Sequence, residues 1–236
     1  MIDFWSVNRY GDIIKETPLF TQFIDNEVPS RYDSNGMLIT ENATEAQLLE
    51  LAALQLQVQT HVKFVFVPGV SVPLLPGFTL GELEVYELVA PLFTKNEAIN
   101  VQFVTEINIE DFLQIKYDDA LAFGETYAKG RIAWLRRMLL AKQVTAAIAY
   151  LGQQAVGALE LIVRQNTVEI DQFFVQPNYQ RQGIGSTMQA FIEEKFPFHT
   201  VFLVADADDT RREMYHKQGY EHRTTFYELL QQPPSL

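Results

Sequence analysis

The sequence predicts an α/β fold of the α+β kind, in which helices cover a mixed sheet and a smaller α/β domain precedes it. Three strand-like runs at residues 145–151, 155–164 and 167–175 support this prediction, because short links of Gly, Gln and Asn join them as hairpins. A helical segment and another strand follow them. That order adds a parallel strand to an antiparallel set, so we expect a mixed sheet with helices on both faces.

Periodicity and capping residues predict the other elements of this second part. Ile109, Phe112 and Leu113 follow Asn108 at helical spacing, and Asn108 can cap a helix. The run 210–213 (Thr-Arg-Arg-Glu) matches a capping box. In order, the predicted elements are a strand at 100–105, a helix from Asn108, a helix from about Ala128, the three strands, a helix at 186–195, a strand at 200–205, a short helix ending at Gly219 and a strand at 224–230.

The first 96 residues carry fewer signals. The run 42–45 (Asn-Ala-Thr-Glu) resembles a capping sequence for a helix that continues to about Gln59. Strands are expected at 61–67 and 83–89, with a loop rich in Pro and Gly between them. Residues 1–40 give no assignment.

The two parts share an order of elements that suggests an internal duplication. In the first part, Gly77-Phe78 and Tyr86-Glu87-Leu88 follow a helix, a strand and a loop, and the second part ends with Gly219-Tyr220 and Tyr227-Glu228-Leu229. Most other side chains do not match, so a generic αβ unit is the alternative. We expect one domain at 1–96, a second at 97–230 and a tail at 231–236.

Composition excludes several classes of function. Eighteen Lys and Arg against thirty Asp and Glu give a net charge of −12, so nucleic acid is not an expected partner. The chain has no cysteine, which excludes Cys-ligated metals and thiol nucleophiles, and its histidines lack ligand spacing, so no metal is expected. It shows neither a basic-then-apolar leader nor a run of about 20 apolar residues, which predicts a cytoplasmic protein without a membrane partner.

The strongest chemical signal lies between Val168 and Met188. This stretch reads as a buried strand, a turn containing Pro, and glycines that open a helix. Gly183 and Gly185 have no Cβ, so a ligand can come close to their backbone. The first turn of a helix leaves N–H groups unpaired at the positive end of its dipole, which suits a diphosphate. Arg181 could add charge at the rim of such a site.

Two motifs in this part match one known family. Residues 180–185 (Gln-Arg-Gln-Gly-Ile-Gly) match a Gln/Arg-x-x-Gly-x-Gly/Ala signature after a strand and a Val-x-Pro turn, and here the sequence resembles the GCN5-related N-acetyltransferase (GNAT) family. Residues 214–220 are similar to the late helix of that family, with its Tyr-x-Lys-x-Gly-aromatic ending. The resemblance covers about 97–230. The N-terminal domain has no such glycine turn and would be a degenerate GNAT-like copy.

The resemblance implies that an acyl group, expected to be acetyl, passes from acetyl-CoA to an amine by direct attack in a ternary complex. The N–H groups from Gln182 to Thr187 would hold the diphosphate. Phe173, Phe174 and Val175 would offer backbone groups to the pantetheine arm, and one N–H would polarise the thioester carbonyl. The expected cofactor-binding residues are Phe174, Val175, Gln180, Arg181, Gln182, Gly183, Ile184, Gly185, Ser186, Thr187, Asp209 and Tyr215.

The same resemblance implies the two proton transfers. Tyr215 would protonate the leaving thiolate, which a phenol of pKa about 10 can do for a thiol of pKa about 8.5. Glu169 occupies a strand position used for a general base, directly or through water. Asp171 shares its face if the strand is regular, whereas a bulge between them would spoil that parity. An Asn that often precedes the family's late helix is replaced here by Asp-rich residues 206–209, so we expect Asp209 to act near the helix start.

Each of these assignments has a structural alternative. Tyr215 could be a core residue, and Glu169 a strand carboxylate without catalytic duty. The chain as a whole could be a catalytically silent acyl-CoA-binding or regulatory module. The expected partners are acetyl-CoA and a small amine or protein amine, and we expect a monomer or a homodimer.

Overall fold

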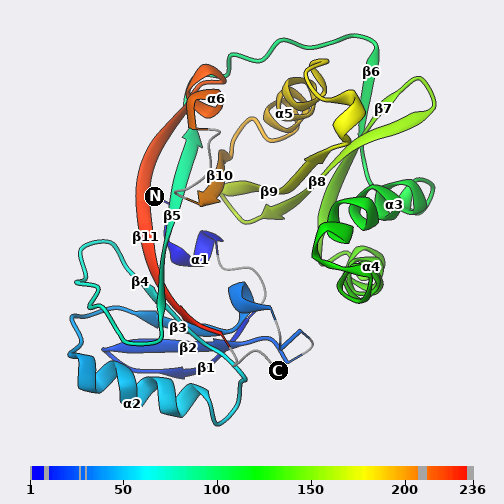
Figure 1. Cartoon of the computed structure of the whole chain (residues 1–236). Coiled ribbons are helices and arrows are strands. Elements are labelled where there is room, and N and C mark those ends of the chain that lie inside the picture. Colours follow the sequence, from blue (N-terminus) through cyan, green and yellow to red (C-terminus); the bar gives the residue numbers. More distant parts are fainter. Residues whose placement is uncertain (1, 8–10, 27, 30, 207–211, 233–236) are drawn as a thin grey trace. The chain divides into compact units, whose positions relative to one another are not determined.

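Residues 145–175 form the predicted antiparallel meander in a computed structural model, which describes residues 2–7, 11–26, 28–29, 31–206 and 212–232 (Figure 1). Strands β7 (Thr145–Leu151), β8 (Gln154–Val163) and β9 (Thr167–Val175) pair in turn. Strand β6 (Ile99–Phe103) pairs antiparallel with β7, and β10 (Thr200–Asp206) runs parallel to β9. The predicted mixed sheet is therefore confirmed.

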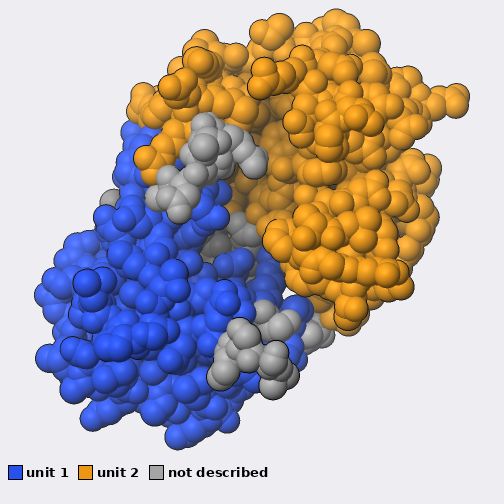
Figure 2. All heavy atoms as spheres, viewed as in Figure 1, with its two compact units in different colours: residues 1–86, 204–210, 222–236 blue, residues 87–203, 211–221 orange. Residues whose placement is uncertain are grey.

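The chain divides into two units, which Figure 2 colours separately. Unit 1 comprises residues 1–86, 204–210 and 222–236, and unit 2 comprises residues 87–203 and 211–221. The last segment belongs to unit 1 because strand β11 (Tyr220–Gln231) pairs antiparallel with β4 (Val62–Phe66). Units defined by contacts need not coincide with sequence domains, so the division into 1–96, 97–230 and 231–236 stays a prediction.

Helices cover both faces of the sheet in unit 2. α3 (Ile109–Ala120) and α4 (Glu125–Leu140) pack together on one face, and α5 (Ile184–Lys195) lies on the other (Figure 1). The short helix α6 (Arg212–Lys217) precedes β11. Within the described residues, no helix has the length and apolar character needed to cross a bilayer. The core beneath α5 includes Leu159, Leu161, Val168, Ile170, Ile184, Met188 and Ile192.

Several helix boundaries differ from the predictions. α4 begins at Glu125 rather than near Ala128, and α5 begins at Ile184 rather than at Ser186. Asn108 does not cap α3 with its side chain. Its Oδ1 instead accepts from the Thr105 N–H over 2.7 Å. The turn before the helix thus uses the side-chain oxygen that would otherwise cap the helix.

Unit 1 holds a second sheet segment, against which α2 packs. After α1 (Phe4–Val7), its strands lie in the order β1-β2-β3-β4-β11-β5. Its core beneath α2 joins Met37, Ile39, Leu48, Phe64, Phe66 and Leu229. The elements not yet bounded are β1 (Asp12–Glu16), β2 (Phe20–Ile24), β3 (Gly36–Ile39), α2 (Glu45–Gln55) and β5 (Thr79–Leu88).

The cap of α2 lies within the predicted capping sequence 42–45. Thr44 is the N-cap, and its hydroxyl accepts from the Gln47 N–H while the Gln47 side chain accepts from the Thr44 N–H. Asn42 instead accepts from the Ser71 N–H over 2.8 Å. The helix ends at Gln55 rather than near Gln59. A full capping box on Thr44 satisfies two backbone donors, which explains why the helix starts there.

The two units repeat one topology. In unit 2 the antiparallel strands β7, β8 and β9 are followed by α5 and then by β10, parallel to β9. In unit 1 the antiparallel strands β1, β2 and β3 are followed by α2 and then by β4, parallel to β3. The predicted likeness of the N-terminal part to the C-terminal part is therefore present in the order and direction of five elements.

Candidate functional site

A left-handed turn opens α5. Gly183, the N-cap, has φ of 82°, and Arg181 two residues earlier has φ of 60°. The left-handed region favours glycine, so Gly183 follows from the backbone conformation. As a glycine, this N-cap has no side chain that could accept a hydrogen bond from the first turn of α5. The first turn of this helix therefore keeps its backbone donors directed outward, as an anion site requires.

The open donors of α5 are fewer than predicted. The Thr187 N–H donates to the Gly183 carbonyl over 2.9 Å, and the Thr187 hydroxyl donates to the same oxygen over 2.9 Å. Thr187 was expected to offer its N–H to the diphosphate, and this internal bond removes it from the site. The N–H groups of Ile184, Gly185 and Ser186 precede the first helical bond, so they have no acceptor within α5.

Side chains hold the loop before α5 in place. The Gln180 amide donates to the Val175 carbonyl over 3.1 Å, and the Gln182 amide donates to the Asn178 carbonyl over 3.2 Å. Asn96 donates from its side chain to the Gln182 carbonyl and from its N–H to the Thr187 hydroxyl, both over 2.9 Å. Asn96 was not among the predicted residues, because nothing in its local sequence indicates this contact.

Gly185 and Gly157 have different reasons to be glycine. A Cβ on Gly185 would lie 3.7 Å from Cζ of Phe173, which is ordinary contact, so Gly185 gives access rather than relieving a clash. A Cβ on Gly157 of β8 would lie 3.2 Å from both Ile184 and Met188. Gly157 thus lets α5 approach the sheet closely. Together these positions bring the helix start beside the ring of Phe173.

Strand β9 leaves its parallel neighbour before it ends. The register of β9 with β10 stops at the pair Glu169 and Phe202, whereas β9 remains paired with β8 as far as Val175. Beyond Glu169, the edge of β9 that faced β10 is thus outside that ladder. Phe173, Phe174 and Val175, which were expected to offer backbone groups to the pantetheine arm, lie in this splayed part.

A bulge follows Glu169 and Asp171. The register of β8 and β9 shifts between Ala158 and Glu160, and Gln172 has φ of 46°. Because the bulge begins after Asp171, Glu169 and Asp171 stay on one face, opposite the face that Val168 and Ile170 bury beneath α5. The parity expected for a regular strand therefore holds up to Gln172.

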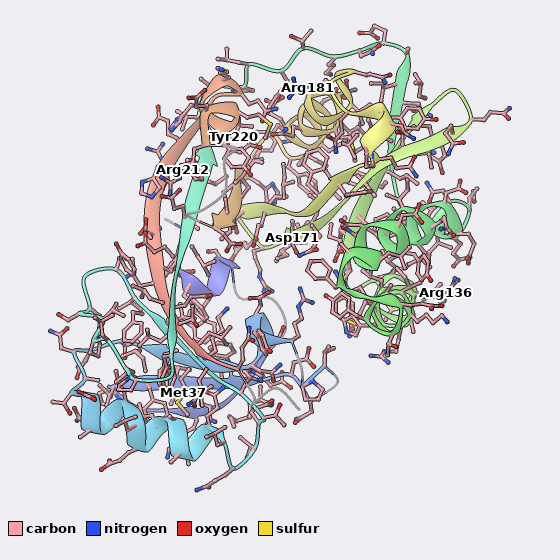
Figure 3. All side chains as sticks on the ribbon, in the orientation of Figure 1. Met37, Arg136, Asp171, Arg181, Arg212 and Tyr220 are labelled. Carbon is pink, nitrogen blue, oxygen red and sulfur yellow. The ribbon has the colours of Figure 1, made fainter. Side chains whose placement is uncertain are left out.

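The two carboxylates of this strand are buried. Glu169 has no exposed surface, and Asp171 is 8% exposed. Figure 3 labels Asp171 on β9 and Arg181 at the loop before α5. The Asp171 carboxylate accepts from the Gln172 N–H over 2.6 Å. Because Glu169 is fully buried, an amine in solvent cannot reach its carboxylate directly. A role as general base therefore needs an intervening water or a local opening of the structure around Glu169.

Tyr215 lies on α6 beside a second phenol. Its ring meets that of Tyr220 edge to face, with 6.2 Å between the ring centroids, and both side chains are buried. Burial raises the pKa of the Tyr220 phenol, and the nearby Tyr215 raises that pKa further. Asp209, predicted near the start of this helix, lies outside the described residues. The Thr210 capping box also lies outside them in part.

Over the described ranges, no group of three or more His, Asp or Glu side chains is arranged to hold a metal ion. The histidines His61 and His216 contact backbone carbonyls, and His222 contacts the hydroxyl of Thr225.

The described part of unit 1 differs from unit 2 at the helix start and at the parallel strand pair. Its crossover helix α2 is closed at the N-terminus by the capping box of Thr44 and Gln47, whereas Gly183 leaves α5 open. Its parallel pair stays together up to Ile39, the last residue of β3, which pairs with Phe66. The described part of unit 1 therefore has a capped helix and a parallel pair that stays together, although the N–H groups of Glu45 and Ala46 precede the first helical bond of α2.

Comparison with protein-family models matches residues 113–227 to the acetyltransferase (GNAT) domain. Comparison with curated proteins gives no match. Among solved structures, a functionally unknown conserved protein from Staphylococcus epidermidis is 27% identical, with a TM-score of 0.85 and coverage of 98% of both chains.

Two further structures share the fold at low identity. A GCN5-related N-acetyltransferase from Kribbella flavida is 15% identical, with a TM-score of 0.61, and the match covers 98% of this chain and 93% of the other. A tandem GNAT protein from the clavulanic acid biosynthesis pathway is 8% identical, with a TM-score of 0.53 and coverage of 92% and 79%. Its tandem architecture fits the repeated topology of the two units.

Proposed function

Residues 113–227 form a domain of the acetyltransferase (GNAT) family, and on this premise we propose that the protein transfers an acetyl group from acetyl-CoA to a primary amine. The observation that carries the proposal is the uncapped start of α5 beside a strand that has left its parallel neighbour. The start of α5 suits a diphosphate, and the splayed part of β9 suits the extended pantetheine arm, which can pair with its backbone groups.

The cofactor is placed by backbone donors. The N–H groups of Gly183, Ile184, Gly185 and Ser186 hold the diphosphate at the positive end of α5. The exposed Arg181 adds charge at the rim. The pantetheine arm then runs along the splayed part of β9, from Val175 toward the bulge. Gln180 and Gln182 act by holding the loop, since their amides already bind loop carbonyls.

The transfer is a direct displacement. A neutral amine nitrogen attacks the thioester carbon, the carbonyl electron pair moves onto oxygen, and the C–S bond then breaks as the carbonyl re-forms. Tyr215 gives its proton to the departing thiolate. The attacking nitrogen loses its second proton to water as the amide forms, and Tyr215 regains a proton from solvent. The ammonium form of the acceptor first loses a proton, which Glu169 accepts through an intervening water because its carboxylate is buried.

Cofactor binding tests the proposal directly. Isothermal titration calorimetry of the full chain with acetyl-CoA and with CoA should give binding for both. Gly183→Val places a β-branched residue at positive φ, which should weaken both affinities by about 10-fold or more. Gly130→Ala on α4 is the matched control, because an added Cβ there meets nothing within 4 Å. Equal affinity of wild type and Gly183→Val would contradict the placement.

Turnover identifies the acceptor class. Release of CoA thiol is followed with spermidine, benzylamine and a Lys-containing peptide, which separate small amines from protein amines. The alternative function, a catalytically silent acyl-CoA-binding module, is favoured by the complete burial of Glu169. It predicts binding without thiol release for every amine. We also keep as proposals the monomeric or homodimeric state and the cytoplasmic location.

A further inference from the structure

Lys116 is a buried cation beneath the bulge of β9. It comes from α3, and its side chain is 2% exposed. Its Nζ donates to the Gln172 carbonyl over 2.8 Å and to the Asp119 carboxylate over 2.9 Å. Burying an ammonium is costly, and an apolar side chain of similar length would avoid that cost. A Met could replace neither hydrogen bond, and the one to Gln172 is the bond that reaches β9.

The carboxylate of Glu160 lies between Lys116 and a second cation, Arg131. Glu160 on β8 lies 4.0 Å from the Lys116 Nζ. It accepts from Nη2 of Arg131 over 2.5 and 2.7 Å, and the guanidinium carbon of Arg131 lies 4.7 Å from the ring centre of Trp134. Burial opposes the charge of Arg131, but the Glu160 carboxylate outweighs it and raises the pKa of Arg131. The α3 face of the sheet therefore carries a fixed ionic network.

Gln172 needs such support. Its φ of 46° lies in the left-handed region, which a non-glycine residue adopts only where the surroundings hold it. Its N–H donates to the Asp171 carboxylate, and its carbonyl accepts from Lys116. Both peptide groups of Gln172 are thus bound by side chains on the side of α3.

The peptide that follows Gln172 transmits this constraint. No cis peptide occurs among the described residues, so the Gln172 carbonyl and the Phe173 N–H point in opposite directions across one plane. The carbonyl points toward α3, because Lys116 on that helix donates to it. The Phe173 N–H therefore points away from α3. The ring of Phe173 lies beside Gly185, at the start of α5.

We propose that Lys116 is a positioning residue for acetyl transfer: by anchoring the bulge at Gln172, it directs the Phe173 N–H at the carbonyl of the bound thioester. This inference rests on the proposed function. When the amine nitrogen bonds to the carbonyl carbon, the carbonyl electron pair moves onto oxygen, and a fixed N–H stabilises that charge. The C–S bond then breaks, and the thiolate receives its proton separately. Lys116 itself does not contact the reacting atoms.

Infrared difference spectroscopy of bound [1-13C]acetyl-CoA tests this role, since a donated hydrogen bond lowers the carbonyl stretching frequency. Wild type should lower that frequency relative to free acetyl-CoA. Lys116→Met and Lys116→Gln should lose about half of this shift or more, and kcat should fall by about 10-fold. Affinity for CoA, which has no acetyl group, should stay within about twofold. Lys116→Gln keeps a polar group at the buried position in case the Met variant fails to fold.

Lys129→Met is the matched control. Lys129 lies exposed on α4 beside Glu125, so its removal should leave the frequency unchanged. An unshifted frequency in wild type, an unchanged shift in a folded Lys116 variant, or an equal loss of CoA and acetyl-CoA affinity would overturn the proposal. If wild type binds neither CoA nor acetyl-CoA, the proposed function fails as well. Binding and turnover with an unchanged shift in a Lys116 variant would remove only the inference about Lys116.

Discussion

The ammonium of Lys63 lies 2.8 Å from the carboxylate of Glu228 and so joins β4 to β11 inside unit 1. A second carboxylate, that of Asp33, lies 3.0 Å from the same ammonium. The Lys63 side chain is 5% exposed, whereas that of Asp33 is 55% exposed, which makes Glu228 the better shielded partner. This ion pair ties the last strand of the chain to the first unit.

Removing one partner of this pair should be costly. Glu228→Gln leaves a buried ammonium with only Asp33, so the free energy of unfolding should fall by about 3 kcal/mol. Urea denaturation measures the change. Glu194→Gln removes an exposed partner of Lys95 and should cost less than about 1 kcal/mol. Similar losses in both variants would show that burial does not strengthen the Lys63 pair.

The same lysine predicts an alkaline dependence. Burial opposes its charge, but Asp33 and Glu228 outweigh burial and raise the pKa of Lys63 above its ordinary value of 10.5. The folded chain thus holds this proton more tightly than the unfolded chain, so the stabilisation is complete below pH 10.5 and is lost as pH rises through the folded-state pKa. Denaturation of Lys63→Met between pH 8 and 11.5 should show a shallower decline than wild type. Parallel declines would contradict this.

His61 predicts the opposite dependence at acid pH. Burial lowers its pKa below 6.5, and the charge of Lys63 adds to this, although the contact with the Asn35 carbonyl opposes it. The unfolded chain then binds the proton first, so stability is full above pH 6.5 and falls as pH drops below it. His61→Gln should flatten this decline between pH 5 and 7. The exposed His222→Gln is the control and should leave the slope unchanged.

Two tyrosine hydroxyls in unit 2 predict opposite effects of deletion. Tyr220 is 1% exposed, and among the described residues its hydroxyl has no hydrogen-bond partner. The Tyr150 hydroxyl donates to Asp111 over 2.7 Å. Tyr220→Phe should raise the melting temperature or leave it unchanged, whereas Tyr150→Phe should cost about 1 kcal/mol. A clear loss of stability in Tyr220→Phe would reveal a partner for its hydroxyl.

The capping box of α2 should contribute to the stability of the chain and not to the binding of acetyl-CoA. Thr44→Ala removes one half of the capping box and should cost about 1 kcal/mol in chemical denaturation. Affinity for acetyl-CoA should not change, because the proposed diphosphate site is at α5. A matched loss of affinity in the calorimeter would place the cofactor against α2 instead.

Tyr215→Phe separates chemistry from binding. If Tyr215 protonates the thiolate, kcat should fall by about 100-fold while the acetyl-CoA affinity stays near that of wild type. Thiol release and calorimetry on the same preparation measure the two quantities. A variant with full turnover would leave Tyr215 as a buried helix residue packed on Tyr220.

Local patterns predicted the elements whose structure depends on near neighbours. The strands between residues 145 and 175 agree with prediction to within one residue at each end, because alternation and turn residues are local signals. β11 was predicted at 224–230 but spans Tyr220–Gln231, because it lies between β4 and β5 in the sheet, and both strands are distant in sequence. Strand β1 was not predicted. All five of its residues are exposed, and apolar and polar residues do not alternate along it.

The sequence by itself determined the glycine turn before α5 and the end of the late helix at Gly219, because glycine has conformational freedom that other residues lack and its spacing is visible along the chain. Only the tertiary structure decided which groups those positions meet. It brought Asn96 against the turn and placed Lys116 under Gln172. Such contacts join residues far apart in the chain, where no local periodicity or propensity can specify a partner.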